Sequence, residues 1–214
     1  MPTMNAFVFD LDGTLLDTMP DLVATTNSAL EEFGLPTHSP QAIQGFVGNG
    51  LRDLISQATP ADTPQQTQQA ILERWKQLYD QHGNQLTRPY PHIPQLLETL
   101  KSQGKKLAVL SNKSDEGAKT IVSQFFPNTF DLVFGEGPVP RKPDPEGLLK
   151  IMLELGVTPE STAFVGDSVG DLKVAKRAGT LALAATWGYQ PLMSLMMCSP
   201  DALLEKPLDL LAYL

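Results

Sequence analysis

The pattern of apolar and polar positions divides the chain into three stretches of different texture. Residues 6–9 form a short apolar run rich in strand-forming residues, and Asp10 and Asp12 follow it closely. From Pro20 to about residue 87, apolar residues recur at helical spacing. From Pro89 onward, short apolar runs alternate with amphipathic segments. The pattern therefore predicts one strand, an all-helical stretch, and then alternating helices and strands.

The helical stretch is predicted to contain four helices. They are expected over 20–34, from 39–40 to 46, over 51–58, and through 71–79 to 82–83. Residues 57–69 are polar and interrupted by prolines, so they are expected to form a loop that leads into the last helix.

The alternating stretch predicts a parallel, doubly wound α/β sheet with helices on both faces. Helices are expected over 93–103, 115–126, 145–155 and 171–178, and strands over 106–110, 130–134, 162–165 and 181–185. Asp144 is expected to cap the third of these helices, with Pro145 at its first position. The tail, 191–214, lacks strand alternation and is expected to form one or two helices that pack over the sheet.

Composition and charge narrow the class of protein. The 214 residues are 42% hydrophobic and 19% charged, which suits a globular core with a small accessory domain. The net charge of -8 argues against binding nucleic acid or anionic membranes by bulk electrostatics. The single cysteine, Cys198, excludes a disulfide framework and is expected to be a buried, inert thiol. Neither a signal peptide nor a membrane span is evident, so a cytoplasmic protein is expected, as a monomer or homodimer.

Polar side chains gather where the predicted strands end. In doubly wound sheets, ligands bind outside the carboxyl ends of the strands. The residues that come after the predicted strands are Asp10 and Asp12; Ser111, Asn112 and Lys113; Arg141 and Lys142; and Gly166, Asp167, Ser168 and Asp171. Four separate elements therefore bring acids, a hydroxyl and cations to one edge of the sheet.

Each of these groups also has an ordinary structural interpretation. Asp12-Gly13 is a good hairpin-turn signal, and Ser111-Asn112 is compatible with a turn or a helix cap. Lys142 alone is compatible with a solvated surface lysine, and Asp171 with a helix N-terminus that favours acids. The occurrence of all of them at four strand ends favours a site.

This set of groups suits phosphoryl transfer. Several carboxylates favour a hard cation such as Mg²⁺, which commonly joins carboxylates to a phosphate. One carboxylate is then placed to attack phosphorus, and a second acid two residues away is placed to protonate the leaving oxygen. A lysine and a hydroxyl would hold the phosphoryl oxygens.

Four short motifs in this order and spacing resemble those of the haloacid dehalogenase superfamily, over nearly the whole chain. The matching stretches are Asp10-Leu11-Asp12-Gly13-Thr14, Ser111-Asn112, Lys142-Pro143-Asp144-Pro145, and Gly166-Asp167-Ser168-Val169-Gly170-Asp171. The resemblance implies a phosphohydrolase with a Rossmann-like core over 1–17 and 88–214. It further implies that the all-helical stretch, 18–87, is a cap domain.

The resemblance also implies roles for individual residues. Asp10 would be the nucleophile, Asp12 the general acid and base, Ser111 a phosphoryl ligand, and Lys142 a charge stabiliser. Mg²⁺ would be bound by Asp10, the Asp12 carbonyl and Asp167, with Asp171 supporting the site or binding directly. Gly13, Thr14 and Asn112 would add substrate contacts.

Within the superfamily, the opening motif and the stretches Val47-Gly48-Asn49-Gly50-Leu51 and Trp187-Gly188-Tyr189 resemble phosphoglycolate phosphatases. In the cap, Gly48, Asn49, Gly50 and Arg52 are candidates to bind a small carboxylate, although Arg52 is equally compatible with a solvated loop arginine. A phosphonate-cleaving enzyme is disfavoured, because the only cap lysine, Lys76, lies mid-helix beside Trp75.

Several other functions are compatible with the same motifs. A pyrophosphatase, a nucleotide phosphatase or a sugar-phosphate mutase would use this core. A receiver-like signalling module also combines an acidic cluster, a hydroxyl and a lysine. The helical insert and Asp12 argue against a receiver, and the complete set of acids argues against a scaffold that only binds.

Overall fold

The computed structural model describes residues 3–214 and is built around one fully buried strand, β1 (Ala6–Phe9). Its side chains alternate between the two faces of the sheet, as the backbone pleat requires. Phe7 and Phe9 belong to the apolar cluster on one face, and Val8 belongs to the cluster on the other face. An apolar core therefore covers both faces, which explains the uninterrupted apolar run in the sequence.

The main sheet has six strands in the order β5-β4-β1-β6-β7-β8, and all adjacent pairs are parallel. The strands other than β1 are β4 (Lys106–Ser114), β5 (Leu132–Glu136), β6 (Thr162–Gly166), β7 (Leu181–Ala185) and β8 (Ala202–Leu204). Phe9 is in register with Val109 of β4 and Val165 of β6, so the carboxyl ends of the three central strands lie level. The predicted parallel, doubly wound sheet is confirmed.

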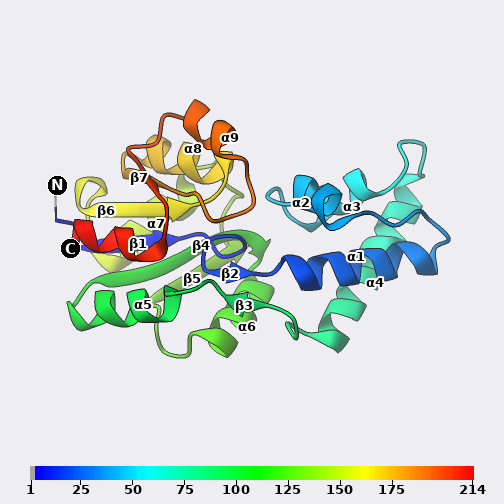
Figure 1. Cartoon of the computed structure of the whole chain (residues 1–214), viewed down its shortest axis with the longest axis horizontal. Coiled ribbons are helices and arrows are strands. Elements are labelled where there is room, and N and C mark those ends of the chain that lie inside the picture. The colour runs from blue at the N-terminus through cyan, green and yellow to red at the C-terminus, as the bar shows by residue number, and fades with distance from the viewer. Residues whose placement is uncertain (1–2) are drawn as a thin grey trace. The chain divides into compact units, whose positions relative to one another are not determined.

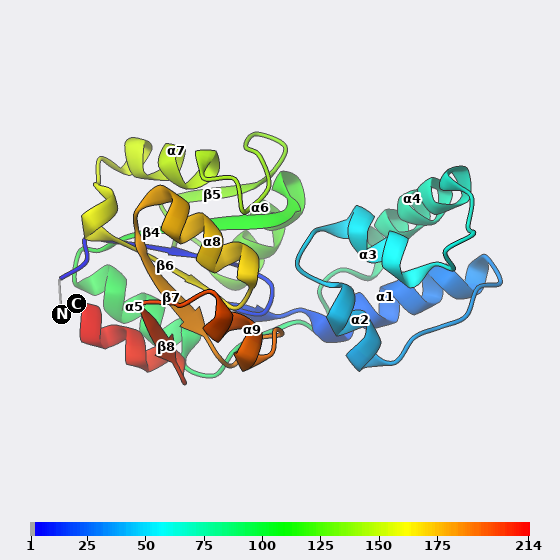
Figure 2. The same cartoon turned by 90° about the horizontal axis from the view of Figure 1, so that it is seen from above.

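Helices cover the two faces of this sheet (Figures 1 and 2). One face packs against α5 (Ile93–Ser102), α6 (Asp115–Phe125) and the C-terminal 3₁₀ helix η2 (Pro207–Tyr213). The other face packs against α7 (Glu146–Leu155), α8 (Val169–Ala178) and α9 (Leu192–Met197), and the short 3₁₀ helix η1 (Pro159–Ser161) leads into β6.

Three expectations for this part of the chain were wrong. The tail was expected to be helical only, but Ala202–Leu204 forms the edge strand β8, paired with β7. Helix α7 begins at Glu146, with Pro145 as its N-cap residue, and Asp144 Oδ1 accepts a hydrogen bond from Glu146 N. Strand β4 continues to Ser114, well beyond its expected end at Leu110. The polar residues after Leu110 therefore lie within the strand.

The chain falls into two compact units, one made of Met1–Leu16 and Pro89–Leu214 and the other of Asp17–Arg88. The second unit contains α1 (Met19–Glu32), α2 (Pro40–Phe46), α3 (Leu51–Ala58) and α4 (Gln65–His82). Its own apolar core includes Ala29, Ile43, Ile71 and Trp75. The loop before α4 was predicted to reach residue 69, but α4 already begins at Gln65.

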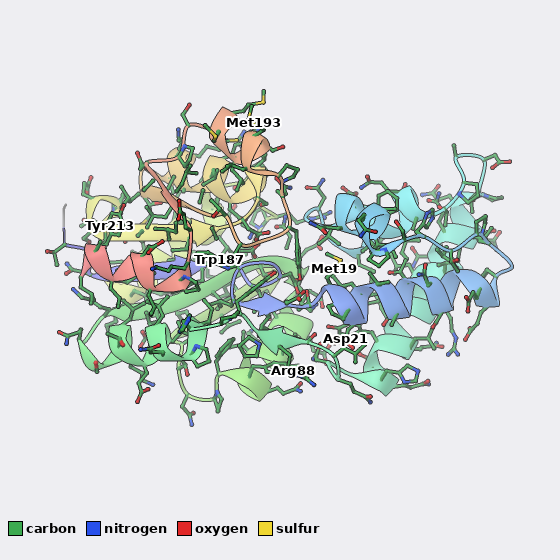
Figure 3. The ribbon with its side chains drawn as sticks, in the orientation of Figure 1. Met19, Asp21, Arg88, Trp187, Met193 and Tyr213 are labelled. Carbon is green, nitrogen blue, oxygen red and sulfur yellow. The ribbon has the colours of Figure 1, made fainter. Side chains whose placement is uncertain are left out.

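A two-stranded ribbon, β2 (Leu16–Asp17) paired with β3 (Arg88–Pro89), carries both chain crossings between the units. Inside the second unit, the buried carboxylate of Asp21 fixes the segment that returns to β3 (Figure 3). It accepts hydrogen bonds from Thr87 N at 2.6 Å, Thr87 Oγ1 at 2.7 Å and Leu86 N at 3.1 Å. None of the helices that the structure describes is long and apolar enough to cross a bilayer.

Candidate active site

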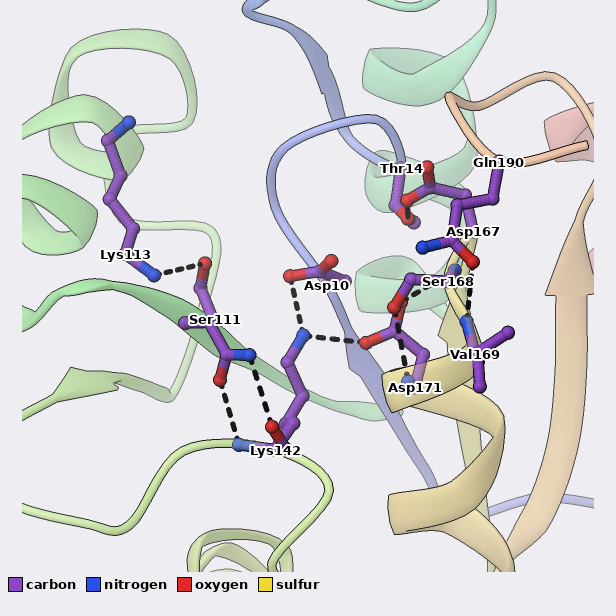
Figure 4. A network of polar contacts seen from close by, with 11 residues as sticks. Asp10, Thr14, Ser111, Lys113, Lys142, Asp167, Ser168, Val169, Asp171 and Gln190 are labelled. Carbon is purple, nitrogen blue, oxygen red and sulfur yellow. Dashed lines mark hydrogen bonds and ion pairs between the residues drawn. The ribbon is translucent and has the colours of Figure 1, made fainter. Parts of the chain in front are cut away.

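The site is built around Asp10, the first residue after β1 (Figure 4). Its backbone N donates to Val165 O at 2.9 Å, which fixes the residue beside β6. The ammonium of Lys142 lies between two carboxylates, 2.7 Å from Asp10 Oδ1 and 2.6 Å from Asp171 Oδ1. Only 3% of the Lys142 side chain is exposed. An almost completely buried cation therefore joins the end of β1 to the first turn of α8 (Val169–Ala178), through Asp10 and Asp171.

Asp167 comes directly after β6, and hydrogen bonds and two close glycines fix its carboxylate. Thr14 Oγ1 donates to Oδ1 at 2.8 Å, and Tyr189 N donates to Oδ2 at 2.7 Å. Two glycines leave the space for this carboxylate. A Cβ on Gly13 would lie 2.4 Å from Asp167 Oδ2, and a Cβ on Gly188 would lie 2.2 Å from Asp167 Cβ. The carboxylate therefore has one well-defined position.

Asp171 is part of the first turn of α8. Its Oδ2 accepts hydrogen bonds from Ser168 N at 2.9 Å and Ser168 Oγ at 2.6 Å, and Ser168 Oγ accepts one from Asp171 N at 3.2 Å. This reciprocal pair is a capping box, in which the helix cap and the acid orient each other. The predicted capping interpretation of Asp171 is thus correct, and the same carboxylate also contacts Lys142 through Oδ1.

Ser111 and Asn112 lie in the last part of β4, next to β1. The amide of Asn112 fixes the backbone of Lys142: Oδ1 accepts from Lys142 N at 2.8 Å, and Nδ2 donates to Lys142 O at 3.2 Å. Ser111 Oγ accepts a hydrogen bond from Lys113 N at 3.2 Å. Asn112, in the Ser111-Asn112 motif, therefore positions Lys142, the lysine of the next motif.

Asp12 lies in the turn directly after β1. Gly13 has a φ of 86°, a conformation that favours glycine, and its N donates to Leu16 O at 2.9 Å. Asp12 and Gly13 therefore lie in a tight turn, but the bridge between Asp12 and Leu16 is parallel, so the hairpin reversal that the turn signal suggested does not form. The carboxylate of Asp12 lies 3.5 Å from Lys113 Nζ, measured from Oδ1.

Burial and mutual repulsion perturb the acids. Burial raises the pKa of the Asp10 carboxyl well above its ordinary value, the charge of Asp171 raises it further, and Lys142 offsets part of the effect. Burial and the charge of Asp171 also raise the pKa of Asp167 from 3.8 to about 7. Burial lowers the pKa of Lys142, but the carboxylates of Asp10 and Asp171 outweigh it and hold that pKa above its ordinary value.

The acids form a set that fits a divalent cation. Asp10, Asp167 and Asp171 are buried, and each offers a carboxylate oxygen within 4.8 Å of the others. With the ammonium of Lys142, the three carboxylates carry a formal charge of -2, which a divalent cation would neutralise. All donors are hard oxygens, the type that Mg²⁺ and Ca²⁺ prefer. The residues present therefore fit such an ion.

The remaining predicted residues lie in the other unit. Gly48, Asn49 and Gly50 form the turn between α2 and α3, and Arg52 lies in the first turn of α3. Arg52 is exposed, and its Nη1 donates to Gln69 Oε1 at 3.2 Å within the same unit. Their role in binding substrate stays a prediction.

The segment after β7 was noted in the sequence only for its resemblance to phosphoglycolate phosphatases, and no role in the site was predicted for it, although it contributes to the site. Trp187 Nε1 donates to Thr14 O at 3.0 Å (Figure 3), Gly188 and Tyr189 enclose Asp167, and Gln190 Oε1 accepts from Val169 N at 2.9 Å. The rule that found the other groups, which inspects the residues just after each strand, would have found this segment as well.

Comparison with known proteins agrees with this geometry. The family model for the haloacid dehalogenase-like hydrolases matches residues 7–185. The chain therefore belongs to that family, and its relatives and structural neighbours identify it as a phosphatase. Phosphatases of this family generally use a divalent metal, consistent with the acidic set.

Individual relatives have more specific names. The chain is 37% identical over 213 residues to the phosphoglycolate phosphatase of Aquifex aeolicus, covering 97% of this chain and 95% of the relative. It is 30% identical over 214 residues to the N-acetylmuramic acid 6-phosphate phosphatase of Pseudomonas aeruginosa, covering 99% and 95%. The crystal structure of a predicted phosphoglycolate phosphatase from Haemophilus somnus superposes with a TM-score of 0.93 at 29% identity, covering 99% and 98%.

Proposed function

We propose that this protein is a Mg²⁺-dependent phosphomonoester hydrolase that works through a phosphorylated Asp10 and acts on 2-phosphoglycolate. One observation carries the chemistry. Asp10 stands at the end of a buried central strand with one oxygen 2.7 Å from the desolvated ammonium of Lys142. The ion pair holds the carboxylate in one orientation, as a nucleophile requires.

In the first step, the carboxylate of Asp10 attacks phosphorus and the bond between phosphorus and the ester oxygen breaks. The leaving oxygen takes a proton from the carboxylic acid of Asp12. In the second step, the carboxylate of Asp12 takes a proton from water as the water attacks phosphorus, and the bond to Asp10 breaks. Asp10 is then restored, and the products are an alcohol and inorganic phosphate.

The other residues would support these steps. Lys142 and the hydroxyl of Ser111 would stabilise the charge on the phosphoryl oxygens. Asp10 and Asp167, with the carbonyl of Asp12, would hold Mg²⁺, and Asp171 would orient Lys142. When bound, Mg²⁺ would neutralise the acids and draw electron density from the phosphoryl group.

The substrate assignment rests on the relatives, among which the name phosphoglycolate phosphatase recurs at 32–37% identity. We propose that the helical unit acts as the cap and that its Gly48–Gly50 turn and Arg52 bind the carboxylate end of the substrate. Replacing Arg52 by Met is then expected to raise KM for 2-phosphoglycolate about tenfold. Arg74→Met removes a partly exposed arginine of the same unit, which pairs with Glu32, and is the control.

The test is steady-state hydrolysis, with Mg²⁺ and with EDTA, across a panel of esters. The panel contains 2-phosphoglycolate, N-acetylmuramic acid 6-phosphate, glucose 1-phosphate, pyrophosphate, nucleoside monophosphates and p-nitrophenyl phosphate. We expect Mg²⁺-dependent turnover that prefers 2-phosphoglycolate and is lost in Asp10→Asn. A different preferred ester would refute the substrate assignment, and turnover by Asp10→Asn would refute the mechanism.

A further inference from the structure

Lys113 is a second lysine, besides Lys142, near the carboxyl ends of the central strands. The proposed mechanism does not use it. It comes after Ser111 and Asn112 in β4, and its side chain is only 12% exposed. Its Nζ lies 3.5 Å from Asp12 Oδ1, an oxygen that is buried and has no hydrogen-bond partner among the described residues. The Lys113 ammonium therefore lies next to Asp12, the acid that we propose protonates the leaving oxygen.

The distance of this contact distinguishes Lys113 from Lys142. Lys142 contacts its two carboxylates at 2.6 and 2.7 Å, as in strong charge-assisted hydrogen bonds. The separation of 3.5 Å between Lys113 Nζ and Asp12 Oδ1 is an ion pair without such a hydrogen bond. Lys113 thus supplies a charge close to Asp12 without fixing that carboxylate tightly.

Simple geometry relates this ammonium to a bound ester. A general acid lies about 3 Å from the oxygen that it protonates, so Lys113 Nζ would lie within about 6.5 Å of the ester oxygen if Asp12 Oδ1 is the donating atom. A carboxylate attached through one carbon has its own carbon about 2.5 Å from that ester oxygen, given bond lengths near 1.5 Å. A carboxylate in that position is within reach of the Lys113 ammonium.

Charge gives a second reason. A substrate with an anionic leaving group brings its negative charge toward four acids, Asp10, Asp12, Asp167 and Asp171. Lys142 already pairs with two of them. With Mg²⁺ offsetting Asp10 and Asp167, Asp12 is the acid that remains beside an anionic leaving group, and like charges in contact repel each other unless a cation lies near them. Lys113 is the lysine beside Asp12, where the leaving group would lie.

We propose that Lys113 determines specificity by pairing with an anionic group one carbon away from the ester oxygen of the leaving group. This inference rests on the proposed function and deepens it: the substrate class is phosphate esters of small hydroxy acids. A competing role is that Lys113 only orients Asp12, in which case it would assist the hydrolysis of charged and neutral esters equally.

The test compares two esters that differ only in that group, 2-phosphoglycolate and 2-hydroxyethyl phosphate. The ratio of their kcat/KM values is expected to fall at least tenfold in Lys113→Met and to be largely restored in Lys113→Arg, which keeps the charge. Lys119→Met is the matched control, because Lys119 is exposed on α6 and pairs with Asp115 at the surface. It should leave the ratio unchanged.

Product inhibition gives an independent measurement. Lys113→Met should raise the inhibition constant of glycolate about tenfold and leave that of inorganic phosphate unchanged. An unchanged ratio of esters, or an equal loss on both, would overturn the inference while the phosphatase chemistry stands. A wild-type protein that hydrolyses neither ester would instead refute the proposed substrate, and the inference with it.

Discussion

Replacing Gly188 by alanine should damage the proposed metal site around Asp167 without unfolding the protein. The added Cβ would lie 2.2 Å from Asp167 Cβ and 2.4 Å from its Cγ and Oδ2. An ordinary contact begins at 3.4 Å, so the two groups must separate by about 1 Å. Asp167 cannot simply move away, because the Cα of Gly13 closes the other side and Thr14 and Tyr189 hold both carboxylate oxygens.

The size of the effect can be worked out from these distances. Overpacking of this kind costs about 1–3 kcal/mol of folding free energy, which a domain of this size tolerates. Mg²⁺ requires ligand distances of about 2.1 Å in near-octahedral geometry, so a ligand displaced by about 1 Å is effectively lost. Disturbing even the outer partners of a metal ligand costs about 10–100-fold in affinity. We therefore expect Gly188→Ala to weaken Mg²⁺ binding at least 100-fold.

Isothermal titration calorimetry with Mg²⁺ measures this loss directly, and the Mg²⁺ dependence of kcat/KM measures it in turnover. Gly170→Ala is the matched control, because its Cβ would lie 3.4 Å from Ser168 Oγ, an ordinary contact. Circular dichroism should report a cooperative melting transition for both variants, with a Tm lowered by several degrees in Gly188→Ala. A Gly188→Ala protein that binds Mg²⁺ within twofold of the wild type would refute the role given to Asp167.

Three further predictions concern the buried charges. Asp21→Ala leaves the buried donors of Thr87 and the partly buried N–H of Leu86 without an acceptor. It should lower the free energy of unfolding by about 3 kcal/mol in urea titrations, whereas Asp62→Ala, at an exposed position, should change it by less than about 0.5 kcal/mol. Lys142→Met should lower kcat about 10²–10³-fold in steady-state assays, and an undiminished kcat would exclude its proposed role. Because the pKa of Asp167 rises from 3.8 to about 7 in the folded, metal-free protein, the folded state holds a proton that the unfolded state has lost between these pH values. The metal-free protein should therefore lose stability, of order 4 kcal/mol, as pH rises from about 4 to 7, and the increase in Tm on adding Mg²⁺ should be larger at pH 8 than at pH 5; an equal increase at both would contradict this linkage.

Helices and strands whose signal lies in the residues of the element itself could be predicted from the sequence. The helix Leu51–Ala58 and the strand Leu181–Ala185 have the bounds expected from periodicity. The edge strand at Ala202–Leu204 was missed because three apolar residues without alternation carry no local strand signal. Its existence depends on pairing with β7, where Leu183 is in register with Ala202. A strand fixed mainly by tertiary pairing is not visible in a single sequence.

The same limit applies to the site. The acids were found because they come directly after predicted strands, a rule that depends only on topology. How they are held was not predictable: Thr14 donates to an acid 153 residues further along the chain. Gly188 was noted only as part of a stretch with a family resemblance, and its importance for the site arises because Asp167 occupies the space of the missing Cβ. Contacts between distant loops decide such details.

The position of β1 in the middle of the sheet has a consequence for synthesis on the ribosome. The strand is made first, but its two neighbours, β4 and β6, end at Ser114 and Gly166. At about 5–20 residues per second, the nascent strand waits roughly 8–30 s for its second partner. During that time four consecutive apolar residues have an unpaired edge, while all residues of the helical unit, 17–88, have already been synthesised. Vectorial synthesis thus delays assembly of the surroundings of Asp10 until most of the chain exists.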